Sequence, residues 1–342
     1  MVRKVAEQHT KAGVCYAWTD DGLELPVVDV THPAFVVDDD PAAINRVVEQ
    51  TLASMARVAQ MPPSALQAMR ESSILMRAMM DAADSILPGI ATYLFKLGPA
   101  NLGDGYASDL DRAIAAGITP LSMRLRLRHM ARALADGLVP RLSSRSGPLH
   151  LVNIAGGSAA DSLNALILLW KEHPELLRRS VSVHVLDADA AGPNFGARAL
   201  EALRAAGAPL EGLAVTLRHV PYDWADPSTL QKFLAGLLDQ SDVLAGTSEG
   251  GLLEYPTDDQ ILANLRLLRE GTPPDFFFVG TVLRDMTTID PRLASMESMK
   301  GRPSIRFMGL ERFGELARRA DWAVTGHWDE AIHHVVRLEK AL

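Results

Sequence analysis

The sequence predicts an α/β protein in which a helical N-terminal cap precedes a doubly wound, mostly parallel sheet. From residue 149 onward, apolar runs of strand length alternate with helical patterns, and strands joined by helices pair in parallel through right-handed crossovers. The first 145 residues show mainly helical spacing. The last two strand candidates are joined by a short turn, which implies an antiparallel pair. We therefore expect a cap domain over residues 1–146 and a sheet domain over residues 147–342.

Composition limits the classes of function. The chain has 342 residues, of which 48% are hydrophobic, and its net charge of −8 disfavours a general nucleic-acid binder, because such a protein needs a basic face. Cys15 is the only cysteine, so we expect no disulfide framework, and a reducing cytoplasm fits. No apolar run is long enough to span a membrane, and the N-terminus lacks the apolar core of a signal peptide. No close set of histidines and carboxylates predicts a metal site.

In the N-terminal part, residues 14–18 and 25–30 have the composition of short strands. Asp40 is placed to cap a helix that has Pro41 in its first position. Helical spacing then predicts helices over 42–60, from after Pro62-Pro63 to about residue 97 with a break at Pro88, and over 120–143. The last of these carries three arginines that we expect on a mostly solvated face, Arg124, Arg126 and Arg128. Residues 143–148 form the expected linker.

The sheet domain is predicted element by element. Strands are expected near 149–154, 181–187, 213–220, 241–245 and 275–282, with a final pair within 320–328 and 333–340. Helices are expected near 159–171, 194–206, 228–239, 258–270 and 310–319. The final pair should form an antiparallel edge on five parallel strands.

A glycine turn follows the first strand of this domain. Gly156 and Gly157 end the apolar run, and glycine lets the backbone approach a ligand without a Cβ atom in the way. A dinucleotide-binding turn would continue to a third glycine, and a P-loop would end in Gly-Lys-Ser/Thr. Here the run is AGGSAAD, with Asp161 just inside the helix, so a nucleoside is the predicted ligand.

Side chains that could complete a nucleoside site follow the next two strands. Asp187 ends the second strand, where its carboxylate could accept hydrogen bonds from ribose hydroxyls, and Asp189 competes for the same role. After the third strand, Asp223 could accept from the exocyclic amine of adenine, and Trp224 or Tyr222 could pack on its ring. An ordinary polar loop is the alternative interpretation.

The fourth strand ends in a segment rich in candidate catalytic groups. In open α/β sheets the carboxyl ends of the strands carry the chemistry. Ser248, Glu249, Glu254 and Tyr255 follow that strand and are therefore candidates.

Residues 149–342 resemble a class I S-adenosylmethionine-dependent methyltransferase. The matching segments are VNIAGGSAADSLNAL, VHVLDAD, PYDW and the final strand pair, and the helical front part resembles that of small-molecule O-methyltransferases, which covers the site and often builds a dimer. The resemblance implies S-adenosylmethionine as cosubstrate and a homodimer through the helical part. It places Gly156 and Gly157 beside the methionine moiety, Asp187 at the ribose, and Asp223 and Trp224 at the adenine.

One departure from that resemblance concerns the general base. In those O-methyltransferases a His-Asp-Trp triplet follows the fourth strand, and its histidine deprotonates the acceptor. Here the matching place is Leu253-Glu254-Tyr255, so the base is missing. We interpret four other histidines as structural, namely His129, His184, His333 and His334.

Three functions remain open. The favoured one is methyl transfer to a carbon or nitrogen atom of a small secondary metabolite, oriented by Glu254 or Tyr255. The second is cyclisation of S-adenosylmethionine to azetidine-2-carboxylate with release of methylthioadenosine, as in the azetidine-2-carboxylate synthases. Six residues could close the site around the folded methionine chain, namely Tyr93, Asn101, Tyr106, Asn153, Tyr222 and Ser248. The two tyrosines of the helical part, Tyr93 and Tyr106, could equally be packing aromatics. The third is a non-catalytic interaction protein with this fold.

Overall fold

The centre of the molecule is a seven-stranded sheet with the order β5-β4-β3-β6-β7-β9-β8. The computed structural model describes residues 11–81, 87–237, 242–294 and 305–341. The strands are β3 (Leu149–Ile154), β4 (Val181–Asp187), β5 (Val215–Pro221), β6 (Val243–Ser248), β7 (Phe277–Leu283), β8 (Trp322–Asp329) and β9 (His333–Lys340). The first five are parallel, and β9 runs antiparallel to both of its neighbours. The predicted fold class is confirmed, although only β8 of the final strand pair lies at an edge of the sheet, since β9 lies between β7 and β8.

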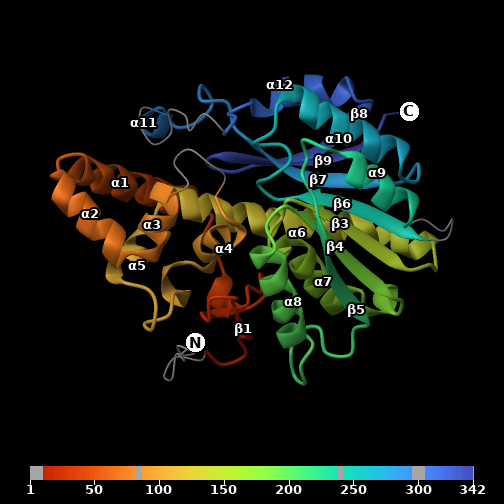
Figure 1. Cartoon of the computed structure of the whole chain (residues 1–342), viewed down its shortest axis with the longest axis horizontal. Coiled ribbons are helices and arrows are strands. Elements are labelled where there is room, and N and C mark those ends of the chain that lie inside the picture. Colours follow the sequence, from red (N-terminus) through yellow and green to blue (C-terminus); the bar gives the residue numbers. More distant parts are fainter. Residues whose placement is uncertain (1–10, 82–86, 238–241, 295–304, 342) are drawn as a thin grey trace.

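Helices cover both faces of this sheet (Figure 1). One face packs against α7 (Ala160–Glu172), α8 (Ala191–Leu203) and α6 (Ile118–Ser144), and the other against α9 (Ser228–Ala235), α10 (Asp258–Glu270) and α12 (Gly309–Arg318). Alternate residues of β3 therefore belong to different cores: Leu151 contributes to the first and Val152 to the second. A sheet that is buried on both faces needs nearly continuous apolar strands, which is why β3 and β7 could be located from the sequence. Two short elements complete this part, η3 (Pro174–Leu177) and α11 (Pro291–Ala294).

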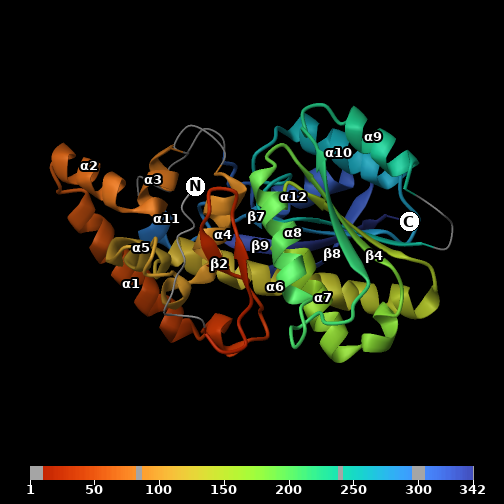
Figure 2. The same cartoon turned by 60° about the horizontal axis from the view of Figure 1, so that its bottom comes forward.

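The N-terminal part combines a small hairpin with a group of helices. Its elements are β1 (Tyr16–Trp18), β2 (Glu24–Pro26), η1 (Pro33–Phe35), α1 (Pro41–Val58), α2 (Pro63–Ser72), α3 (Ile74–Asp81), α4 (Gly89–Leu97), η2 (Pro99–Asn101) and α5 (Asp109–Ala115). The predicted cap of α1 is confirmed, since the Asp40 carboxylate accepts from the backbone N–H groups of Ala42 and Ala43. The hairpin lies against α8, where Arg198 donates to the carbonyl of Trp18 (Figure 2).

Helix α6 joins the two parts of the molecule. It begins among the cap helices and then runs beneath the sheet beside α7 (Figure 1). The approach is close, because a Cβ atom on Gly137 would lie 2.3 Å from Cε2 of Phe277. A division of the chain at residue 146 therefore stays a prediction, since the helix before it packs on the sheet. The expected solvated face is wrong for Arg126, which is 2% exposed because α6 is covered on several sides.

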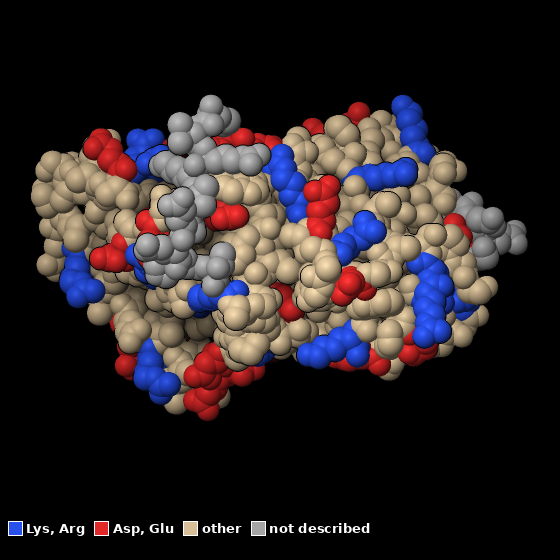
Figure 3. Space-filling model, turned by 90° about the horizontal axis from the view of Figure 1, so that it is seen from below, with Lys and Arg blue, Asp and Glu red and all other residues tan. Residues whose placement is uncertain are grey.

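The surface carries charged side chains of both signs. On the face drawn in Figure 3, acidic and basic side chains are interspersed over the described residues. No helix in the described part of the chain is long and apolar enough to cross a membrane. Within the same residues, no group of three or more histidine, cysteine or acidic side chains is arranged to hold a metal ion.

Candidate active site

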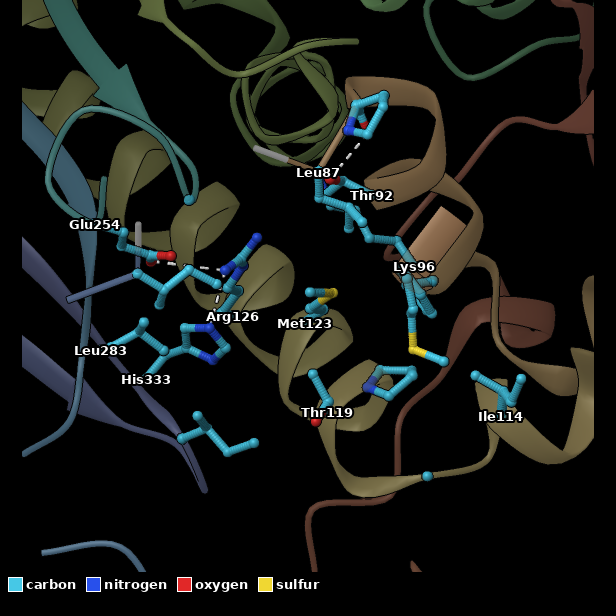
Figure 4. Close-up of a pocket in the computed structure, with 18 of the residues that line it drawn as sticks. Leu87, Thr92, Lys96, Ile114, Thr119, Met123, Arg126, Glu254, Leu283 and His333 are labelled. Atoms are coloured by element: carbon cyan, nitrogen blue, oxygen red, sulfur yellow. Dashed lines mark hydrogen bonds and ion pairs between the residues drawn. The ribbon is translucent and has the colours of Figure 1, made fainter. Parts of the chain in front are cut away.

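A cavity of about 870 Å³ lies between the carboxyl ends of the central strands and the cap helices. Its volume is within the range of small-molecule sites, which is about 300–1,000 Å³. One end is lined by the glycine turn after β3 and by the acids after β4, and the other by α1, α2, α3 and α5. Helices α4 and α6 form the wall between the two ends (Figure 4).

The glycine turn presents bare backbone to this cavity. A Cβ atom on Gly156 would lie 1.9 Å from Oδ1 of Asn153, so no larger residue fits there without moving the asparagine. Gly157 has a φ of 57°, and a Cβ atom on Gly192 would lie 2.8 Å from its Cα atom. Both residues of the turn line the cavity, as the sequence predicts for a ligand-binding turn.

Two predicted cofactor contacts are buried side chains held by hydrogen bonds within the protein. The amide Nδ2 of Asn153 donates to Asp161 Oδ1 (2.7 Å), Ser162 Oγ (3.1 Å) and Thr247 Oγ1 (2.9 Å). The Ser248 hydroxyl accepts from the backbone N–H of Leu252 at 2.9 Å. Neither side chain lines the cavity. Asn153 and Ser248 therefore hold the shape of the site and are not placed to contact its ligand.

Asp187 connects the end of β4 to the glycine turn. Its Oδ2 atom accepts from the N–H of Gly157 at 3.0 Å, and its Oδ1 atom accepts from the N–H of Asp189 at 2.9 Å. Burial raises the pKa of Asp187, and these two hydrogen bonds oppose that shift. Asp189 accepts from the N–H of Ala191 at the start of α8, and both acids line the cavity. A carboxylate oxygen has further lone pairs, so Asp187 can still accept ribose hydroxyls.

The segment after β5 divides into residues that face the cavity and one that does not. Tyr222 is buried and lines the cavity, and its hydroxyl donates to Oδ1 of Asn264. The rings of Trp224 and Tyr255 are nearly parallel, with centroids 6.5 Å apart, and both line the same end. Asp223 is exposed, and its carboxylate accepts from the N–H of Ala225 at 2.8 Å. Because Asp223 is not part of the cavity wall, the structure does not place it at an adenine.

A buried cluster of charged side chains lines the cavity, and Figure 4 shows Arg126 beside Glu254 and His333 within it. Lys96 Nζ lies 2.7 Å from Glu249 Oε2, and Arg126 Nε lies 3.2 Å from Glu249 Oε1. Arg126 Nη1 lies 3.7 Å from Glu254 Oε1 and 3.0 Å from His333 Nε2. Burial alone would raise the pKa of Glu249, but the charges of Lys96 and Arg126 lower it. The cluster contains two cations and two carboxylates, so the charges balance.

His333 lines the cavity but is already fully used as a hydrogen-bonding group. Arg126 can only donate, so Nε2 of His333 must be the acceptor of that bond, and Nδ1 then carries the proton and donates to Ser122 Oγ at 2.8 Å. Burial and the Arg126 charge hold the pKa of His333 well below its usual range. With its lone pair occupied, His333 cannot act as a general base.

Glu254 has one occupied oxygen and one open oxygen. Thr281 donates its hydroxyl proton to Oε1 at 2.5 Å, and the backbone N–H of Gly250 donates to the Thr281 hydroxyl at 2.8 Å. Among the residues that the structure describes, Oε2 has no hydrogen-bond partner, although the side chain lines the cavity. Burial raises the pKa of Glu254, while Arg126 and Thr281 oppose the shift. Glu254 therefore presents an unpaired acceptor to a ligand.

The two predicted tyrosines of the cap lie away from the cavity. The Tyr93 hydroxyl donates to the carbonyl of Pro26 and accepts from the N–H of Val28, both at 2.9 Å, so it attaches the hairpin to α4. Tyr106 packs against Gly103 and is also absent from the cavity wall. For both, the packing interpretation fits their positions, and the structure gives no support for a catalytic role.

The cap end of the cavity has a wall that the sequence did not reveal. It is mainly apolar and includes five half-buried methionines, namely Met55, Met69, Met76, Met79 and Met123. Methionine is flexible and polarizable, so it fills irregular spaces and adapts to different apolar partners. This end of the cavity can therefore accept an apolar body.

The strand order and the antiparallel β9 are those of the class I S-adenosylmethionine-dependent methyltransferase fold. No protein-family model matches the sequence, and no curated protein matches it. A possible exported protein from Bordetella parapertussis has a similar structure, with a TM-score of 0.55 and 19% identity over 89% of this chain and 100% of that one.

Two methyltransferase structures show weaker similarity. An O-methyltransferase family 2 protein from Planctomyces limnophilus, solved with apigenin, has a TM-score of 0.40 and 16% identity over 92% of this chain and 99% of that one. The 1,6-didemethyltoxoflavin-N1-methyltransferase of Burkholderia thailandensis, solved with S-adenosylhomocysteine, has a TM-score of 0.37 and 15% identity over 62% of this chain and 79% of that one. At these identities the similarity concerns the fold alone.

Proposed function

We propose that this protein transfers a methyl group from S-adenosylmethionine to a small metabolite without a histidine base. The cavity carries the proposal. It continues from the end lined by Gly156, Gly157 and Asp187, here called the nucleoside end, past the charged cluster. It then opens into the mainly apolar cap end, here called the apolar chamber, which the five methionines line. A second substrate can therefore lie beside the first. Dimerisation through the helical part and a secondary metabolite as acceptor stay predictions from the sequence.

Three features of the nucleoside end support binding of S-adenosylmethionine. The bare backbone of Gly156 and Gly157 leaves room for the methionine moiety, and Asp187 keeps lone pairs for the ribose hydroxyls. The parallel rings of Trp224 and Tyr255 offer apolar faces to the adenine. Asp187 also connects the turn to β4, so binding the ribose and shaping the turn are coupled.

Catalysis on this proposal is mainly positioning. A methylsulfonium is already a strong electrophile, and holding a nucleophile in line with its carbon removes much of the entropic cost of the reaction. In this proposal Glu254 orients the nucleophile through its open Oε2 atom, which is supported by its position in the cavity wall. His333 contributes by fixing Arg126, whose guanidinium in turn lies beside Glu254.

Purified protein incubated with S-adenosylmethionine alone tests the proposal. We expect binding of S-adenosylmethionine and S-adenosylhomocysteine by calorimetry, and S-adenosylhomocysteine as product only after a metabolite extract is added. Methylthioadenosine and a cyclic amino acid formed without an acceptor would establish cyclisation instead, and would leave the apolar chamber without a role. Absence of any binding would reject both reactions and favour an interaction protein.

A further inference from the structure

The open oxygen of Glu254 indicates which kind of nucleophile this site accepts. In the charged cluster, both oxygens of Glu249 are paired with Lys96 and Arg126, and the lone pair of His333 is taken by Arg126. Within the described residues of this cluster, Glu254 Oε2 is therefore the acceptor that a ligand can reach. The group that binds there must be a hydrogen-bond donor.

A neighbouring carboxylate favours a nitrogen nucleophile over an oxygen nucleophile. A hydroxyl acceptor must lose its proton before or during methyl transfer, which requires a base with a pKa near the operating pH or above. A carboxylate is a weak base for that purpose, even when burial raises the pKa of Glu254. A neutral amine already has a lone pair and needs no base. Positive charge then develops on its nitrogen in the transition state, where an adjacent carboxylate stabilises it.

The chamber beyond Glu254 defines the rest of the acceptor. Its wall holds the five methionines of the cap and further apolar side chains such as Ile114, Leu283 and Phe307. Arg57, on the outer part of α1, is exposed. Polar side chains such as Ser54 and Thr119 also line the cavity, but most of this wall is apolar, so a largely polar or charged body would lose its hydration and gain few partners. The chamber therefore suits a hydrocarbon or ring body.

We propose that the acceptor is an apolar amine, with its N–H group on Glu254 Oε2 and its body in the methionine-lined chamber. The inference rests on the proposed function and specifies its second substrate. The amine enters as the free base and leaves its proton in bulk water. Its lone pair forms the new N–C bond as the methyl C–S bond breaks, and the bonding electrons stay on sulfur as S-adenosylhomocysteine. The product ammonium donates to Glu254 and gives up its extra proton to water on release.

Matched pairs of small probes test the nitrogen preference. With S-adenosylhomocysteine bound, hexylamine is an ammonium ion near neutral pH and so resembles the product ammonium. It should bind about tenfold or more tightly than hexanol in ligand-observed NMR, because it forms a charged pair with Glu254, whereas the neutral hydroxyl of hexanol donates a single hydrogen bond; tenfold corresponds to about 1.4 kcal/mol. Hexylamine should also bind about tenfold more tightly than butylamine if the chamber takes the chain, at about 0.8 kcal/mol per methylene. Equal binding of amine and alcohol would overturn the assignment of nitrogen.

Glu254→Gln is the diagnostic variant, because glutamine keeps an oxygen for the Thr281 hydroxyl while removing the charge. We expect the amine-over-alcohol ratio to fall to about twofold or less, with affinity for S-adenosylhomocysteine unchanged. Glu172→Gln, at an exposed pair with Arg132, is the matched control and should leave the ratio intact. A retained ratio in Glu254→Gln would overturn the inference and leave the proposed function standing. Failure of wild-type protein to bind S-adenosylhomocysteine would instead reject the proposed function.

Discussion

The two ends of the cavity have walls made of different kinds of residue. At the nucleoside end the wall is backbone and short acids fixed at strand ends, and Gly156 leaves no room for even one methyl group against Asn153. At the cap end the wall consists of long flexible side chains, including five methionines on four different helices. A rigid wall suits a ligand of one fixed structure, such as a cofactor. An adaptable wall suits a second ligand whose shape is less constrained.

The charged cluster lies where cap helices meet the segment that follows β6. Lys96 and Arg126 come from the cap helices, whereas Glu249 and Glu254 follow β6 of the sheet. Each ion pair therefore joins one part of the molecule to the other. Because the groups are buried, the pairs determine both the relative placement of the two ends and the availability of Glu254.

The largest effect is expected from Arg126→Met, which removes the central cation at similar volume. Glu254 and Glu249 would lose a partner while staying buried, and breaking a buried pair in this way costs about 3–5 kcal/mol. The free energy of unfolding from urea titration at pH 8 measures this. The loss should be smaller at pH 6, because the unpaired Glu254 can then take up a proton.

Arg132→Met, on the same helix, is the control for that variant. Its exposed pair with Glu172 should contribute no more than about 1 kcal/mol. Equal destabilisation by the two substitutions would show that the cluster does not bridge the two ends of the cavity.

Sequence patterns located the nucleoside end because that end depends on local structure. An apolar run followed by glycines or an acid marks a strand end, and parallel topology brings such ends to one edge, which placed Gly156, Gly157 and Asp187 together. Neighbouring side chains in a loop, however, point in different directions. Tyr222 faces the cavity and Asp223 faces solvent, which the spacing alone does not distinguish.

The cap end was not predictable for a different reason. Lys96 and Arg126 lie on helices whose rotation and position are set by tertiary packing. Within the run RLRLR, the three arginines together have the pattern of a solvated face, so the burial of Arg126 was not predictable. The one sequence signal was the charged residue in the apolar run YLFKL, since a lysine is rarely buried unless it is paired. Its partner, Glu249, lies 153 residues further along the chain.

Asp187→Ala should weaken binding at the rigid end. Loss of hydrogen bonds from the carboxylate to the ribose and to the Gly157 N–H predicts a loss of about 1.5–3 kcal/mol in S-adenosylhomocysteine affinity by calorimetry. Asp223→Ala removes an exposed acid from the same edge and should change the affinity by less than about threefold. The reverse ranking would restore Asp223 as the contact and remove Asp187.

Asp161→Asn tests the support beneath the glycine turn. Burial, together with the nearby Glu249 charge, raises the pKa of Asp161 to about 6. A pKa above the unfolded value means that the folded state binds the proton more tightly between about pH 4 and pH 6, so wild-type protein carries the full penalty only above that window.

The asparagine variant should therefore be more stable by about 1–3 kcal/mol at pH 8, with the difference shrinking at pH 5. Urea titrations of both proteins at the two pH values measure it. Asparagine can still accept from Asn153 Nδ2, so the contact under the turn is kept. A difference that grows toward low pH would contradict the assigned direction of the shift.

The smallest effect is expected from Met123→Leu, at the adaptable end. Methionine and leucine are similar in volume, so the free energy of unfolding should change by less than about 1.5 kcal/mol and S-adenosylhomocysteine affinity should not change. Affinity for hexylamine should shift by only a fewfold, because the other methionines can repack around the ligand. A loss as large as that from Asp187→Ala would show that the cap wall is as rigid as the nucleoside end, and the contrast between the two ends would then fail.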